Sequence, residues 1–394
     1  MRWISFVMLG VIGWNASQAS AAEPLVESYL HSGQLARGEL ELETALAAAP
    51  ADDQIRFGLA VVQLVRGVER LGQSLHESGL LANNIQATFL RIPVPTNPDP
   101  SPITYQGLRR ILEQFQSDLE RVERTLSGIQ SEDVSLPLRL ADIRFDLTGS
   151  GQARERFIDL LKRMLGPGFR EDPENPEFTV GFDRGDVAWL RAYCHLLMAL
   201  IDLNLAVDTE AHFRLIAESQ FAKAKFRPAP LTKTPVTDEV TIVDPARLRH
   251  FRLHMVKVCE LNRESWAFIR AETDNRFEWL PNPRQTGVLR MPVTDQMVDR
   301  WLAMVHELES LLTGQKKIPA GIMKFIQPSA DHGMNLRKFL DAPPDTIDWD
   351  RVRRDGVRAQ YQDDKLPDVS IDAFIAAFMA FNNTLAVGYA AWFN

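Results

Sequence analysis

The sequence contains only two cysteines, Cys194 and Cys259, in 394 residues. A disulfide-stabilised secreted protein of this length needs more of them, so the chain is not a disulfide scaffold. One bridge between the two is open, because both lie in helical patterns and could face one core. The alternative is two buried free thiols that pack as small apolar side chains.

The chain also lacks the short motifs that mark several enzyme classes. It has no phosphate-binding loop, no GxSxG nucleophile elbow and no GxGxxG dinucleotide fingerprint. The chain also lacks an excess of positive charge, because it has 44 lysines and arginines against 52 aspartates and glutamates, which gives a net charge of -8. Nucleic acids require clustered cations, so we expect no nucleic-acid partner.

Long apolar runs are missing, and the one at the N-terminus is too short to cross a bilayer. Arg2 precedes a largely apolar run at residues 3–14, and small or polar residues with small-x-small spacing follow at residues 15–22. A membrane span needs about 20 apolar residues, so this pattern predicts a secretory signal peptide over residues 1–22. With cleavage near Ala21 to Ala22, we expect the mature chain to be secreted or periplasmic.

A second uncharged run occupies residues 373–393, near the C-terminus. Polar residues 382–384 interrupt it, and no positive cluster follows to anchor it at a membrane surface. The run therefore predicts a buried core helix, and we expect no transmembrane segment in the mature chain.

Helical periodicity dominates the rest of the sequence. It predicts helices over residues 34–49, 53–77, 105–129, 187–207, 244–279 and 294–312. Strand patterns are confined to residues 178–182 and 236–243, and to residues 134–147, where a helix also fits. We therefore predict an all-α fold, a multi-helix domain with minor short β segments.

A cluster of five prolines divides the chain at residues 92–102. Such a proline density excludes regular structure and favours a stiff connector. It predicts a helical N-terminal region over residues 23–91 and a large helical domain over residues 103–394.

The N-terminal region resembles a tetratricopeptide repeat. Tyr29 precedes a turn at residues 31–33, Ala45 stands where the family has a small residue, and Pro50 ends the second helix. Residues 59–60 would begin the next 34-residue unit, so about one and a half units are visible over residues 24–77. The resemblance implies a packed helical hairpin, and in the family such hairpins build a groove that binds peptides.

Residues 146–157 resemble the calcium loop of EF-hands and dockerins. Asp146, Thr148 and Ser150 stand at loop positions 1, 3 and 5, and Gly151 stands at position 6. Phe157 stands at position 12, where the family has a bidentate Glu. With one carboxylate and two hydroxyls, we expect a degenerate loop that has lost the ion and retains at most weak Ca²⁺ binding. No cofactor is predicted.

Two further pairs carry candidate chemistry. His250 and His254 are four residues apart on one helix, a spacing that suits zinc ligands, although Phe251 replaces the Glu of the metalloprotease pattern. Asp183 and Asp186 precede the apolar helix and could form a catalytic carboxylate pair or cap that helix. Trp279 stands before a proline-rich turn and is a candidate exposed aromatic residue for ligand contact.

The absence of catalytic motifs and the tetratricopeptide-like hairpin together favour a secreted, non-catalytic protein. We expect it to bind a protein, peptide or other ligand, or to act as a scaffold, in the cell envelope. Two alternatives stay open. One is a hydrolase, metal-assisted through His250 and His254 or acid–base through Asp183 and Asp186. The other is a structural protein with a decayed calcium loop.

Overall fold

The computed structural model describes residues 24–81, 94–165, 172–224, 239–326, 328–381 and 393. The predicted signal peptide lies outside these residues. Within them the chain forms thirteen α-helices and three two-stranded sheets, which confirms the all-α prediction with minor β segments.

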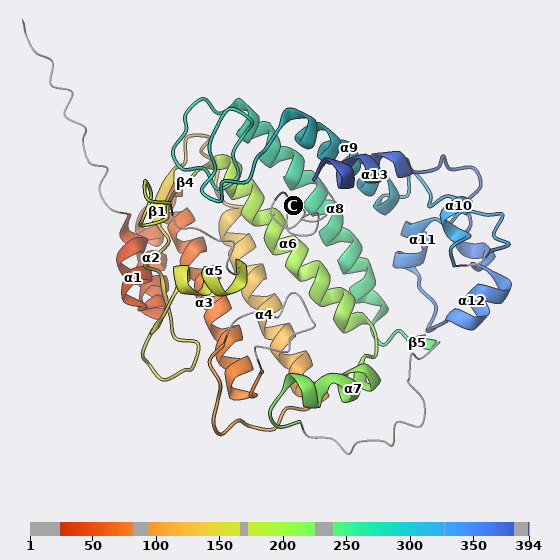
Figure 1. Ribbon diagram of the computed structural model, residues 1–394, viewed down its shortest axis with the longest axis horizontal. Coiled ribbons are helices and arrows are strands. Elements are labelled where there is room, and N and C mark those ends of the chain that lie inside the picture. The colour runs from red at the N-terminus through yellow and green to blue at the C-terminus, as the bar shows by residue number, and fades with distance from the viewer. Residues whose placement is uncertain are drawn as a thin grey trace, which may run out of the picture.

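Four helices form the N-terminal part of the described chain (Figure 1). They are α1 (Leu25–Ser32), α2 (Leu35–Ala48), α3 (Asp53–Glu77) and α4 (Tyr105–Leu126). Gly33, with φ of 68°, ends α1 in the left-handed conformation and reverses the chain into α2. The Asp52 side chain accepts hydrogen bonds from the backbone N–H groups of Gln54 and Ile55, both at 3.0 Å, and so begins α3.

The centre of the fold is the pair of long helices α6 (Arg184–Ala206) and α8 (Pro245–Ala271), which pack along each other (Figure 1). Helix α4 packs on α6, and α9 (Asp295–Leu312) packs on α8. The prediction that α8 continues to Trp279 is wrong, because Glu272 takes an extended conformation. The Asn282 amide donates to the carbonyl oxygens of Ile269 and Glu272 and so caps the end of the helix.

Short strands connect these helices. Strand β1 (Leu136–Arg139) pairs antiparallel with β4 (Thr179–Phe182), with Leu138 opposite Val180. Strand β2 (Arg144–Phe145) pairs with β3 (Glu155–Arg156), and β5 (Glu239–Thr241) pairs with β6 (Thr346–Asp348). Two shorter helices are α5 (Phe157–Leu165), which crosses in front of α3 in Figure 1, and α7 (Glu210–Gln220), which lies at the lower edge of that view.

The C-terminal part contains α10 (Ala320–Met323), α11 (Leu336–Asp341), α12 (Trp349–Asp355), the 3₁₀ helix η4 (Ala359–Tyr361) and α13 (Ile371–Ala380). Helix α13 falls in the run expected to be a buried core helix. Its Ala377 is buried, but Ile375 and Phe378 are each 50% exposed, so that expectation is wrong for this part of the run. Residues 382–392 lie outside the described residues. No described helix combines the length and apolarity that a membrane span requires.

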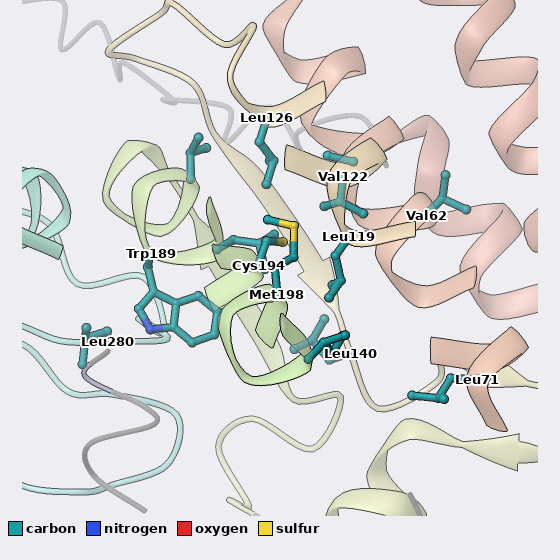
Figure 2. Close-up of a cluster of buried hydrophobic side chains, with 14 of the residues drawn as sticks. Val62, Leu71, Leu119, Val122, Leu126, Leu140, Trp189, Cys194, Met198 and Leu280 are labelled. Carbon is teal, nitrogen blue, oxygen red and sulfur yellow. The ribbon is translucent and has the colours of Figure 1, made fainter. Parts of the chain in front are cut away.

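The core runs through both halves of the chain. Buried side chains of α3 (Val62, Leu71) and α4 (Leu119, Val122) belong to the same cluster as Cys194 and Met198 of α6 (Figure 2). Residues 94–102 of the proline-rich connector contain no helix or strand, and α3 packs directly on α4 across it. The division into two domains stays a prediction.

Candidate functional site

The N-terminus of α6 holds the two predicted aspartates. Asp183 is the N-cap, and its Oδ1 accepts a hydrogen bond from the Gly185 N–H at 2.8 Å. Asp186 reaches back, and its Oδ2 accepts from the Asp183 N–H at 3.0 Å. The two residues thus form a reciprocal capping box, which confirms the prediction that one of them caps this helix.

Two glutamates that the sequence pattern did not identify join the aspartates. Glu272 follows α8 and Glu278 lies in the next loop, and an oxygen from each lies within 4.8 Å of the other and of an Asp183 oxygen. Gln285 donates to Glu272 Oε2 at 3.1 Å, and the Arg276 N–H donates to Glu278 Oε1 at 2.7 Å. We call Asp183, Asp186, Glu272 and Glu278 the acidic cluster.

The acidic cluster holds protons more tightly than isolated carboxyls do. Burial and the neighbouring Asp183 charge raise the pKa of Glu272 to about 8. The same two causes raise the pKa of Asp186 well above its usual value, and burial raises the pKa of Asp183 and Glu278. In the described part of the chain, no lysine or arginine forms an ion pair with any of the four. The cluster therefore stays partly protonated near neutral pH and would accept a cation.

An apolar cavity of about 240 Å³ adjoins this cluster. Its wall includes Phe57 and Val65 of α3, Phe182 of β4 and Trp189 of α6, and Asp186 is the one acidic residue among its lining residues. Trp279 is partly buried in this wall, where its ring lies 5.7 Å from that of Trp189. The aromatic residue expected to be exposed thus contributes to the cavity.

The predicted zinc ligands His250 and His254 face different surroundings. His250 is exposed, whereas the Nδ1 atom of His254 lies 2.8 Å from Nδ1 of His195 on α6. Among the residues that the structure describes, the only three His, Cys, Asp or Glu side chains placed to share a metal ion are Asp183, Glu272 and Glu278. Neither histidine belongs to that group.

The EF-hand-like loop connects β2 to β3, and its donor groups make hydrogen bonds to the carboxylate of its first residue, Asp146. Asp146 Oδ1 accepts from the Thr148 hydroxyl at 2.9 Å and from the Ser150 N–H at 3.2 Å, and Oδ2 accepts from the Gly151 N–H at 2.6 Å. Burial raises the pKa of Asp146, but these hydrogen bonds outweigh burial and lower it. Phe157 begins α5 and packs toward Phe178.

Both cysteines are buried free thiols in the structure. Burial raises the pKa of Cys259 to about 12 and also raises that of Cys194. Neither thiol therefore supplies a thiolate at neutral pH.

No family model, curated protein or solved structure matches the chain. The tetratricopeptide and EF-hand resemblances therefore stay predictions, and the function rests on the site alone.

Proposed function

We propose that the protein binds a small apolar amine in the cavity between α3 and α6, in the cell envelope after its signal peptide is removed. The observation that carries the proposal is an apolar cavity whose lining residues include Asp186, a buried acidic residue whose carboxyl group also caps α6. Binding sites for small molecules combine such apolar walls with a few placed polar groups.

The size of the cavity sets the size of the ligand. An engineered protein cavity of about 150 Å³ holds one benzene molecule, and this cavity measures about 240 Å³. It therefore suits a molecule of one to two aromatic rings. The ring faces of Trp189 and Trp279 would contact the apolar body, and burial of that body supplies about 25 cal/mol per Å².

The charge of the site selects the head group. Asp186 lies beside Asp183, Glu272 and Glu278, and these carboxyls repel one another when ionised. An amine is already an ammonium ion in neutral water, so Asp186 would release its proton to solvent and form an ammonium–carboxylate pair, which balances the negative charge of the cluster. A carboxylate ligand would increase the repulsion, and an alcohol would leave it unchanged.

Calorimetric titration with three naphthalene derivatives tests this selection. We expect 1-naphthylmethylamine to bind at one site, at least tenfold more tightly than 1-naphthalenemethanol, and 1-naphthoate not to bind. Asp186→Asn keeps a capping oxygen but removes the acid, so the advantage of the amine should disappear. Equal affinity for the amine and the alcohol, or no saturable binding, would overturn the proposal.

A second candidate is an acid–base hydrolase, which the close approach of the Asp183 and Glu272 carboxyl groups favours. The pKa of Glu272, about 8, suits a general acid near neutral pH. Assaying a panel of hydrolase substrates with wild-type protein and Glu272→Gln separates the two functions. A turnover that the substitution abolishes would favour the hydrolase.

The tetratricopeptide-like hairpin supports a protein or peptide partner as a further proposal. Crosslinking of tagged mature protein in envelope extracts tests it, since a hairpin that serves only packing would capture no specific partner.

A further inference from the structure

A second cavity, of about 330 Å³, lies in the C-terminal part of the chain. Its lining residues come from the paired strands β5 and β6 and from α10, α11, α12 and η4. Figure 1 shows α10, α11 and α12 on the opposite side of the view from α3. Among the described residues, none lines both this cavity and the one between α3 and α6, so a ligand bound here would be independent of the proposed amine.

The buried part of the wall is apolar and aromatic. Met323 and Tyr361 are buried, and Phe339 and Trp349 are partly buried. The rings of Phe339 and Tyr361 meet edge to face with their centroids 5.4 Å apart. The Tyr361 hydroxyl donates to the Ala342 carbonyl oxygen at 2.8 Å, so its polar group is already satisfied. Such a wall suits the ring of an aromatic ligand.

Charged residues of both signs complete the lining. Glu239 of β5 stands directly opposite Asp348 of β6 in the two-stranded sheet. Arg351 belongs to α12, and Arg358 follows that helix. Glu239, Arg351 and Arg358 are exposed, whereas the apolar wall is buried or partly buried. The charged residues therefore lie where the cavity opens to solvent.

These four charges have few partners within the protein. In the described part of the chain, neither Glu239 nor Arg358 forms an ion pair. Asp348 Oδ1 accepts the Arg351 N–H at 2.9 Å, and a carboxylate can accept several more hydrogen bonds. The Arg351 guanidinium lies 3.8 Å from Asp355 Oδ2, which is beyond hydrogen-bond distance. The opposed acidic pair would gain from a bound cation, and the two arginines would gain from a bound anion.

We propose that this cavity binds a free aromatic amino acid in its zwitterionic form. The ring would contact the apolar wall, the carboxylate would pair with Arg358 and Arg351, and the ammonium group would pair with Glu239 and Asp348. A ligand with one charge would be attracted by two of the four residues and repelled by the other two. A zwitterion pairs with both signs, so the charges at the mouth select it.

The size of the cavity agrees with this class of ligand. It measures about 330 Å³, roughly twice the ~150 Å³ of an engineered cavity that holds one benzene molecule. A molecule with about twice as many heavy atoms as benzene, such as phenylalanine, would therefore fill it.

Calorimetric titration of the full mature chain at pH 7 tests the selection with four small molecules. We expect L-phenylalanine to bind at one site, roughly tenfold more tightly than phenethylamine, which lacks the carboxylate, and 3-phenylpropanoate, which lacks the amine. L-serine carries both charges without the ring and should not bind. Equal affinity for L-phenylalanine and any of the other three, or no saturable binding of L-phenylalanine, would overturn the proposal.

Four variants locate the binding site. Val352→Phe places extra volume in this cavity, and Arg358→Gln removes a charge from its mouth, so each should weaken L-phenylalanine binding by roughly fivefold or more. Arg354→Gln is the matched control, because Arg354 is exposed on α12, pairs with Asp355 and does not line the cavity. Val65→Phe fills the cavity between α3 and α6 and should also leave this binding unchanged, which separates the proposal from the amine site. Wild-type affinity in Val352→Phe or in Arg358→Gln would overturn the proposal.

Discussion

Replacing Glu272 with glutamine should make the protein more stable at high pH. Burial and the charge of Asp183 raise the Glu272 pKa from 4.5 to about 8, so the folded state binds a proton that the unfolded state releases. The favourable contribution of this proton is complete below pH 4.5 and is lost as the pH rises through about 8. Glutamine carries no charge and removes this loss.

The shift in pKa sets an upper limit on the effect. Each pKa unit corresponds to about 1.4 kcal/mol, so full ionisation would cost about 5 kcal/mol. Glu272 is only partly buried, so solvent screens its charge and reduces this cost. We therefore expect Glu272→Gln to gain about 2 kcal/mol at pH 9 and almost nothing at pH 4.5.

Urea unfolding at pH 4.5, 7 and 9 measures this difference. Glu260→Gln is the matched control, because Glu260 lies exposed on α8 and pairs with Lys257 at the surface. Its stability curve should run parallel to that of the wild type. The reasoning would be refuted if Glu272→Gln also ran parallel, or if it lost stability at pH 9.

Three further substitutions test other parts of the fold by urea unfolding. Asp52→Ala removes the cap of α3 and should cost about 1 kcal/mol, so an unchanged stability would mean that solvent caps the helix equally well. Arg70→Ala leaves buried Asp118 without the guanidinium that donates to both its oxygens at 2.6 and 3.1 Å. It should cost about 2–3 kcal/mol, and a cost below 1 kcal/mol would contradict this account. Asp146→Ala leaves the loop donors without their acceptor and should cost about 2 kcal/mol, equally with and without calcium, whereas a calcium-dependent cost would identify a working ion site.

Local sequence patterns predicted the elements whose causes are local. The helix after Asp183 follows from its apolar residues and its cap, and the start of α8 follows from Asp244 and Pro245, whose positions suit a helix N-terminus. The sequence pattern predicted the wrong end for α8, because Phe277 and Trp279 continue the apolar pattern beyond the last residue of the helix. In the structure Phe277 has a φ of 63°, and the chain there is a loop.

The candidate site depends on packing between segments far apart in sequence. Asp183 was identified from its capping pattern, but Glu272 and Glu278 reach it only because α8 packs along α6 and ends beside its N-terminus. No local spacing relates these residues.

The histidines illustrate the same limit. The four-residue spacing of His250 and His254 suggested a pair on one helix face. The packing of α8 on α6 instead brings His254 to His195, 59 residues earlier in the chain.

The central claim is that the cavity between α3 and α6 binds a ligand, and a cavity-filling substitution tests it most directly. Val65→Phe places extra volume in this cavity, whereas Val352→Phe fills a separate cavity of about 330 Å³ in the C-terminal part. Titration with 1-naphthylmethylamine should give one-site binding to the wild type and to Val352→Phe, and at least tenfold weaker binding to Val65→Phe. Equal binding to all three proteins would contradict the claim.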